Sequence, residues 1–394
     1  MKGMKIRQVT AAERAEVVFP LTAYAFEPTA DFEGLREKYR ARMRYFEHVT
    51  TLVAEEAGGE AVACVAAYPM LQNVRGRVLD MAGVSSVASQ PASRRKGYVR
   101  ELLWQLLRQM RDQGAVVSTL YPFRPSFYGR FGFVGMPRRR RVGFAPGGLP
   151  AVELPGYVEQ VPMAEGFAEY TGLLSRMCAQ THGFALFDEL RTREFGEAKV
   201  WLALARAEQG EVLGALAYEI KNFGDVLDGR DLLATGPLGR ALLLQFLGRH
   251  VDQVRKVTLS VGADVVPELW GTDLEVTLEG LVDFPTHGGP MARVLDMRGL
   301  DGIAARDGDV TVEVVDDAFI GGVHRLVGDG GQLSVTTGGA SQARLTVAGL
   351  SALVYGVLDP VEVMSRGLGE IEYPAVEKLR AMFPREMPYL FADF

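Results

Sequence analysis

One order of predicted elements occurs twice in this 394-residue chain, and it constrains the fold more than any other feature. In the first copy, a hairpin, a third strand, an amphipathic helix and a fourth strand are predicted at residues 52–56 and 61–68, 78–87, 98–113 and 115–121. The second copy repeats them at 200–205 and 212–218, 231–234, 238–250 and 254–261. Because strands alternate with a crossover helix, we predict an α/β fold that has been duplicated within the chain.

The last part of the chain has a different pattern. From residue 288 on, short strands divided by Gly and Asp turns precede two helices, predicted at 350–358 and 374–382. This pattern is typical of an α+β domain. We therefore divide the chain into residues 1–150, 151–287 and 288–394, in keeping with about 150 residues per domain.

The composition excludes several classes of protein. Apolar residues make up 48% and charged residues 23% of the chain, which excludes disordered and fibrous classes. No apolar run approaches the roughly 18 residues of a membrane-spanning helix, and no secretory signal opens the chain. The two cysteines cannot build a disulfide framework, and the five histidines have no metal-ligand spacing. We expect a cytoplasmic protein that has no bound metal and no membrane partner.

Positive charge is concentrated in one segment of an acidic chain. The net charge is −6, yet residues 94–141 hold 12 Lys and Arg against two acids. Such a local field suits a small polyanion, for example a phosphorylated cofactor. Nucleic acid is the competing partner. The arginine run at 138–141 lacks the interleaved aromatics that stack on bases, so we interpret it as a solvated strand edge and expect no nucleic-acid partner.

The motif that indicates chemistry lies between Val84 and Arg100. A strand ends at Pro91, and the turn R-R-K-G then opens a helix at Tyr98. The first N–H groups of a helix are unpaired and lie at the positive end of its dipole. Gly97 removes a side chain where a phosphate has to approach, and the three cations add charge. The motif predicts a pyrophosphate-binding turn.

This turn resembles the Arg/Gln-x-x-Gly-x-Gly/Ala motif with which the GCN5-related N-acetyltransferase (GNAT) superfamily binds acetyl-CoA, although Val99 stands where Gly or Ala is usual. A longer pattern resembles the enhanced-intracellular-survival (Eis) family. It consists of V-A-S-Q-P-A-S-R-R-K-G-Y-V-R around the turn, F-Y-G-R-F-G-F at 127–133 and the ending Y-L-F-A-D-F. That resemblance covers essentially the whole chain. It implies two GNAT-like domains, the second without cofactor, a sterol-carrier-protein-like third domain, and a hexamer.

The resemblance also implies site residues. Main-chain groups at the end of one strand would meet the pantetheine arm, the basic turn would hold the pyrophosphate, and two residues before the aromatic loop would line the thiol end. In that order, the cofactor-binding residues are Val87, Ala88 and Ser89; Arg94, Arg95, Lys96, Gly97, Tyr98, Val99 and Arg100; and Phe123 and Arg124.

Two catalytic residues follow from the resemblance. Tyr128 matches the tyrosine that acts as general acid toward the departing thiolate, although from the residues alone we favour a core aromatic. The terminal carboxylate, here on Phe394, matches the general base. An α-carboxyl has a pKa of about 3.5, so it is a weak acceptor that benefits from desolvation. The two phenylalanines in L-F-A-D-F favour a docked terminus over a frayed one.

The substrate class remains open at the level of sequence. Residues 288–394 hold 15 Asp and Glu against nine Lys and Arg, and this acidity favours a cationic amine such as a polyamine, an aminoglycoside-like compound or a lysine side chain. The leading hypothesis is therefore an acetyl-CoA-dependent N-acetyltransferase. The alternative is a lipid or hydrophobic-ligand binding protein that uses the third domain.

Overall fold

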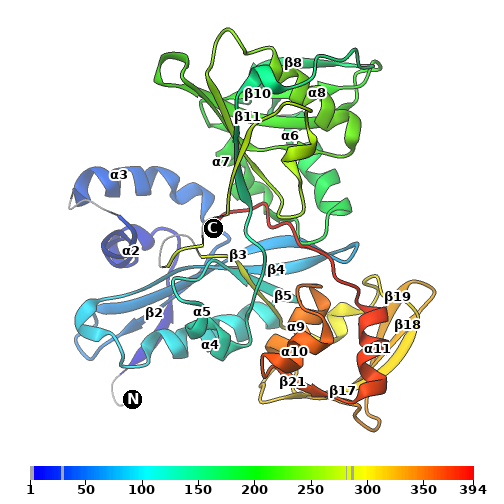
Figure 1. Ribbon diagram of the computed structural model, residues 1–394. Coiled ribbons are helices and arrows are strands. Elements are labelled where there is room, and N and C mark those ends of the chain that lie inside the picture. The colour runs from blue at the N-terminus through cyan, green and yellow to red at the C-terminus, as the bar shows by residue number, and fades with distance from the viewer. Residues whose placement is uncertain (1–3, 28–30, 281, 285–287) are drawn as a thin grey trace.

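The computed structural model describes residues 4–27, 31–280, 282–284 and 288–394. It contains three sheets with their helices (Figure 1). The second unit (green) lies above the first sheet, and the third unit (yellow to red) lies to one side of it. The terminal segment leaves the third unit and returns to the space between the first two, where the C-terminus is marked.

The first third of the chain supplies most of the first sheet and its helices. The strands are β1 (Lys5–Gln8), β2 (Thr50–Glu55), β3 (Ala61–Val74), β4 (Arg77–Ser89), β5 (Val117–Leu120) and β6 (Val134–Gly135). The helices are α1 (Arg14–Val17), α2 (Phe19–Phe26), α3 (Phe32–Arg42), α4 (Tyr98–Asp112) and α5 (Pro125–Tyr128). Helix α4 packs on the sheet through apolar residues at helical spacing, namely Leu102, Leu103, Leu106, Leu107 and Met110, all of which are buried.

The middle third supplies most of the second sheet. Its strands are β7 (Arg140–Phe144), β8 (Tyr157–Pro162), β9 (Ala185–Phe187), β10 (Trp201–Arg206), β11 (Val212–Lys221), β12 (Val226–Asp231), β13 (Leu233–Ala234), β14 (Lys256–Val261) and β15 (Val276–Glu279). Its helices are α6 (Met163–Gln180), α7 (Glu189–Gly196) and α8 (Pro237–Gly248). The expected hairpin, helix and final strand are present. The strand predicted at 231–234 lies earlier, as β12, with only the short β13 at 233–234, and the elements β8, β9, β15, α6 and α7 were not predicted.

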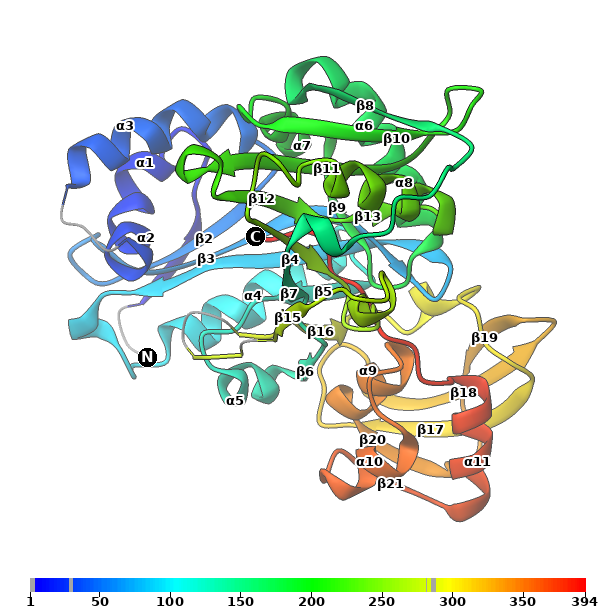
Figure 2. The same cartoon turned by 45° about the horizontal axis from the view of Figure 1, so that its top comes forward.

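The last third supplies the third sheet and one strand of the first. The elements are β16 (Met291–Val294), β17 (Gly308–Val315), β18 (Gly322–Asp329), β19 (Gln332–Thr337), β20 (Ala343–Thr346), α9 (Val347–Val354), α10 (Pro360–Ser365), β21 (Gly369–Ile371) and α11 (Tyr373–Met382). Every residue of α9 is buried, and this helix contacts both β16 and β20 (Figure 2). It therefore joins the third unit to the first sheet. None of the described helices is long and apolar enough to cross a membrane.

The first two sheets share one strand order. The first runs β1-β2-β3-β4-β5-β16-β6, and the second runs β8-β10-β11-β12-β14-β7-β15. In each sheet the fourth and fifth strands pair in parallel, β4 with β5 and β12 with β14, and a helix connects them. This correspondence supports the duplication predicted from the sequence.

Two strands complete a sheet built mainly from another part of the chain, and a third, β9, pairs with β3 of the first sheet. The sixth position of the first sheet is filled by β16, which follows the second unit, and the sixth position of the second sheet is filled by β7, which follows the first. A linear division at residues 150 and 287 therefore does not describe these two sheets. We still propose three consecutive units, in which β7 of the first unit pairs in the second sheet and β16 of the third unit pairs in the first sheet.

The arginine run at 138–141 was wrongly predicted to be a solvated strand edge. Strand β7, which contains Arg140 and Arg141, lies inside the second sheet between β15 and β14. Arg139 forms a partly buried ion pair with Asp231, and Arg141 pairs with Asp228. Acidic partners on β12, about 90 residues away in the sequence, account for Arg139 and Arg141, whereas Arg140 donates to the carbonyl oxygens of Ala263 and Val265.

Candidate active site

Strand β4 changes direction at its carboxyl end. Cys64 pairs with Ala88 and Ala66 pairs with Ser85, so two residues of β4 oppose one of β3, and Ser86 has a φ of 51°. This is a β-bulge, which bends and twists its strand. The parallel pairing of β4 with β5 ends at Val84 and Leu120. The edge of β4 beyond Val84, where Val87, Ala88 and Ser89 lie, is thus separated from β5.

The basic turn lies directly after this edge and opens α4. Gly97 is the residue before the helix, with a φ of 89° and no side-chain cap. The amide of Glu101 donates to the Gly97 carbonyl oxygen at 3.2 Å, so the amides of Tyr98, Val99 and Arg100 precede the first helical hydrogen bond of α4. These amides and the positive end of the α4 dipole form a site for an anion.

Glu56 binds three side chains in and beside the basic turn. Its carboxylate accepts hydrogen bonds from Lys96 Nζ at 3.0 Å, from Tyr98 Oη at 2.8 Å and from Ser93 Oγ at 3.3 Å. The bond from Lys96, followed by that from Tyr98, lowers the pKa of Glu56. Lys96 and Tyr98 therefore hold the turn in shape.

The turn has four exposed cations, Arg94, Arg95, Lys96 and Arg100, of which Lys96 is bound to Glu56. Arg100 lies beside Glu101, with Nε 3.2 Å from its carboxylate. The three arginines are the cations of the turn that stand free of the Glu56 cluster and can approach a phosphate.

Tyr128 lies at the end of α5, which follows β5. The predicted aromatic loop thus contains a short helix, which begins at Pro125 and has Arg124 directly before it. The Tyr128 ring is 2% exposed and packs edge-on against Phe123, Phe127 and Phe133, with centroids 5.1–6.3 Å apart. Burial raises the pKa of the Tyr128 phenol, so it stays protonated and able to donate well above neutral pH.

Phe394 lies over the face of β4. Its ring contacts the rings of Tyr68, Tyr121 and Phe187 at centroid distances of 5.7–6.5 Å. A Cβ at Gly83 would lie 3.1 Å from the Phe394 ring and 2.5 Å from the Met70 sulfur, so only glycine leaves room for both. The terminus therefore lies where β4 and β5 separate. Its ring contacts Tyr121, two residues before Phe123, and the Phe123 ring in turn packs against Tyr128.

Arg139 fastens the segment that leads to Phe394. Its guanidinium donates to the Asp231 carboxylate at 2.8 Å, to the Phe391 carbonyl oxygen at 3.0 Å and to the Asp393 carboxylate. Burial alone would lower the pKa of Arg139, but the carboxylate of Asp231 raises it above its ordinary value. The cation is permanent and its contacts are partly buried, which makes it a strong anchor for the tail.

Two tyrosines add to this anchorage. Tyr121 Oη donates to the Ala392 carbonyl oxygen at 3.1 Å, and Tyr389 Oη donates to Asp231. The Tyr389 amide donates to the His182 carbonyl oxygen at 2.8 Å. The docked terminus expected from the sequence is thus present, held by residues of the first and second units.

Sequence reasoning missed these anchors and one further polar group. The hydroxyl Oγ of Ser85 is buried and has no hydrogen-bond partner among the described residues. Ser85 follows Val84, the last β4 residue paired with β5, and it lies two positions from Gly83, which faces Phe394. A buried hydroxyl without a partner is costly, so its position at the opening between β4 and β5 fits a site that takes a polar ligand.

A polar hollow of about 450 Å³ opens beside Asp393, on the sheet of the second unit. Its charged lining residues are Arg139, Arg141, Glu219, Lys221, Asp228, Arg230, Asp231 and Asp393. Several of these charges neutralise one another, as in the pairs of Asp228 with Arg141 and with Lys221. The space next to the terminus is therefore hydrophilic and lined by both signs of charge.

All the predicted site residues lie near the carboxyl ends of β4 and β5. They are the strand end at 87–89, the turn at 94–100, Phe123 and Arg124 after β5, Tyr128 on α5, and Phe394, whose ring lies over Gly83. Carboxyl ends of parallel strands, with a helix N-terminus between them, are a common place for ligands in α/β sheets. The arrangement places the anion site at the start of α4 beside the free edge of β4, as a phosphorylated ligand requires.

Comparison with known proteins indicates the class of the first unit. Residues 5–135 match the acetyltransferase (GNAT) domain family. An uncharacterized N-acetyltransferase of Streptomyces avermitilis is 25% identical over 92% of this chain and 91% of its own. N-acetyltransferase Eis of Mycobacterium tuberculosis is 39% identical over 119 residues, a segment that spans only 29% of each chain. The crystal structure of Eis1 from Mycobacterium abscessus shares the fold over 99% of this chain and 100% of its own, with a TM-score of 0.78 at 17% identity.

The first unit is accordingly a GNAT acetyltransferase domain. The chain thus contains a domain of the GNAT acetyltransferase type, and acetyl-CoA is the co-substrate that this class of domain uses.

Proposed function

We propose that this chain is an Eis-type enzyme that transfers acetyl from acetyl-CoA to a primary amine of a cationic small molecule, aminoglycoside- or polyamine-like, or of a lysine side chain. One observation carries the proposal most directly. The uncapped start of α4, with Gly97 at positive φ and three exposed arginines around it, provides amides and cations for a diphosphate.

The cofactor residues divide by the part of acetyl-CoA that they meet. Residues 87–89 offer the main-chain edge of β4 to the amide-containing pantetheine arm, and residues 94–100 hold the pyrophosphate. Phe123 and Arg124 line the thiol end. The Oγ of Ser85 adds a polar group near that end, where it would hydrogen-bond the bound substrates.

The transfer itself needs two proton movements. An alkylamine has a pKa of about 10.4, so it must lose a proton before its nitrogen can attack the thioester carbonyl carbon. The carboxylate of Phe394 accepts that proton, directly or through a water. The new C–N bond then forms as the C–S bond breaks, and the Tyr128 phenol donates a proton to the departing thiolate. The acylated nitrogen loses its second proton, which restores the Tyr128 phenol by way of solvent.

The remaining features of the resemblance belong to the same proposal. The shared strand order of the first two sheets supports a tandem GNAT arrangement, in which the second unit has no R-R-K-G turn before α8. We further propose a sterol-carrier-protein-like third domain, a hexameric assembly and a cytoplasmic location, with neither nucleic acid nor membrane as a partner.

The cofactor turn is tested by Gly97→Ala. A Cβ at a φ of 89° is strained and projects where the diphosphate approaches, so we expect the Kd of CoA to rise by about tenfold in calorimetry. Gly210→Ala is the matched control, since Gly210 has a φ of 91° in the β10–β11 turn and open space around it. Equal affinity in both variants and the parent protein would contradict the proposed turn.

The substrate class is tested by thiol release from acetyl-CoA in the presence of spermidine, kanamycin and a lysine-containing peptide. We expect at least one of these to accelerate release well above hydrolysis by water, and to give an acetamide product by mass spectrometry. An anionic primary amine such as aspartate serves as the control and should react more slowly. Acetamide formation with none of the three cationic amines would refute the proposed substrate class.

A further inference from the structure

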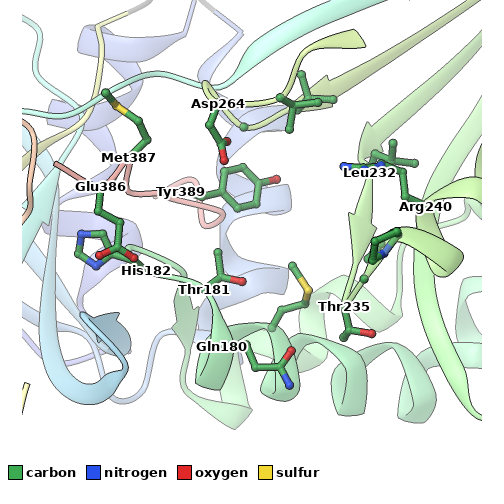
Figure 3. A pocket seen from close by; sticks show the side chains of 17 residues that line it. Gln180, Thr181, His182, Leu232, Thr235, Arg240, Asp264, Glu386, Met387 and Tyr389 are labelled. Carbon is green, nitrogen blue, oxygen red and sulfur yellow. The ribbon is translucent and has the colours of Figure 1, made fainter. Parts of the chain in front are cut away.

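A second cavity lies in the second unit, away from the candidate active site. Its volume is about 510 Å³, within the range of small-molecule sites. Figure 3 shows its lining, which comes from three sources. These are the end of α6 with the residues after it, the strand ends at β13 and β14 with the start of α8, and the terminal segment at Glu386, Met387 and Tyr389.

The cavity occupies the counterpart of the acetyl-CoA opening. The parallel strands β12 and β14 correspond to β4 and β5, and α8 corresponds to α4. Leu232, Ala234, Thr235 and Gly236, which line the cavity, occupy the stretch between β12 and α8, as residues 90–97 do between β4 and α4. The duplicated fold has therefore kept an opening at this position.

This opening does not suit a CoA-sized ligand. The turn before α8 holds no Lys or Arg, and Arg240 is the one arginine or lysine that lines the cavity. Tyr389 also reaches across toward β12, where its hydroxyl binds Asp231, the last β12 residue paired with β14. The terminal segment thus takes the space that a pantetheine arm would follow, and only a smaller ligand fits.

The charges on the walls of the cavity are separated by sign. Arg240 lies on the α8 side, where the uncapped helix start adds positive potential, and Asp264 and Glu386 lie on the opposite side (Figure 3). Among the described residues, no ion pair involves Arg240 or Asp264, and Glu386 makes only a long one, 3.4 Å from Arg75. Opposed, largely unused charges favour a ligand that carries both signs.

Between the charged walls, the lining offers hydrogen bonds and some apolar surface. Thr181 and Tyr389 lie in the middle of Figure 3, Gln180 lies below them, and Leu232 and Met387 lie on either side. We propose that this cavity is a binding site for a small zwitterion, an amino acid or dipeptide, with its carboxylate toward Arg240 and its ammonium toward Asp264 and Glu386.

Such a ligand would also bear on the terminal segment. Glu386, Met387 and Tyr389 form one wall, and Phe394 lies five residues beyond Tyr389 on the same segment. A ligand that binds only the docked segment stabilises that state by mass action. Occupancy of the cavity therefore slows opening of residues 386–394.

The test uses the full-length chain, with and without saturating CoA, and measures binding by calorimetry and thermal shift. The probes are glycylglycine, glycyl-leucine and ornithine, each at up to about 10 mM, a range that detects millimolar affinity. We expect at least one probe to bind equally with and without CoA, and to slow hydrogen exchange at residues 386–394. N-acetylglycylglycine and glycylglycinamide, which each lack one charge, should bind at least about tenfold more weakly than glycylglycine.

Variants assign the binding to this cavity. Arg240→Gln and Asp264→Asn should each raise the Kd of the bound probe by about tenfold, whereas Arg249→Gln and Glu268→Gln, whose side chains lie outside the lining, should leave it unchanged. All four side chains are exposed, so the variants are expected to fold. Failure of all three probes to bind, or binding unaffected by both Arg240→Gln and Asp264→Asn, would overturn the proposal. Neither result bears on acetyl transfer, which is assayed separately.

Discussion

Conversion of the Phe394 carboxylate to a carboxamide is expected to lower kcat by about 100-fold or more, with the Kd of acetyl-CoA unchanged. The amide keeps the ring contacts with Tyr68, Tyr121 and Phe187 and the anchorage of Asp393 by Arg139, and it removes only the proton acceptor. Single-turnover acetyl transfer by protein prepared through terminal ligation measures the effect.

The pH dependence gives this prediction a second readout. Since the carboxylate serves to deprotonate the amine, the loss should be greatest near neutral pH and should shrink as the pH approaches the amine pKa of about 10.4. Protein prepared by the same ligation but with a free carboxylate on Phe394 is the control, and it should have wild-type activity. A chain extended by Gly-Ser beyond Phe394, which displaces the carboxylate, should lose activity to a similar degree. Wild-type turnover by the amide would eliminate the terminus as the base.

The second large effect is expected for Tyr128→Phe, with a fall in kcat of about 100-fold. Loss of the hydroxyl leaves the thiolate to depart without a proton, while the ring packing against Phe123, Phe127 and Phe133 is retained. Because burial raises the pKa of Tyr128, the wild-type enzyme should show no loss of this acid up to about pH 10, the ordinary pKa of a tyrosine.

A matched control separates catalysis from packing. Tyr218→Phe removes another buried hydroxyl, from the second unit. It should change the melting temperature about as much as Tyr128→Phe and leave kcat intact. An acetyl thioester of a more acidic thiol needs less protonation on departure, so it should narrow the gap between Tyr128→Phe and wild type. A gap of the same size with both thioesters would point to a structural role for Tyr128.

The parts of the fold and site that could be predicted are those encoded by neighbours in the chain. The apolar spacing of α4 predicts its length to within one residue, and the hairpin of β2 and β3 follows from two apolar runs around a glycine turn. The R-R-K-G turn likewise lies within a few residues of the helix that it opens. Local periodicity and turn chemistry are sufficient in these places.

The rest depends on partners far away in sequence. Arg139 and Arg141 were interpreted as solvated because nothing near them indicates that Asp231 and Asp228 lie opposite. The exchange of β7 and β16 has no local signature either, since a short apolar strand can pair in either sheet. The sequence does not indicate that the Ser85 hydroxyl lacks a hydrogen-bond partner, because this depends on where the pairing of β4 with β5 ends.

The pairing of β7 and β16 outside their own units limits where the chain can be cut into fragments that fold. A fragment that ends at residue 150 would carry β7 without the strands on either side of it and would leave a gap between β5 and β6 that only β16 fills. Exposed, unfilled strand edges invite aggregation, so neither half should survive proteolytic separation as an independent body. Each of the first two sheets is therefore complete only when a strand from a neighbouring unit is present.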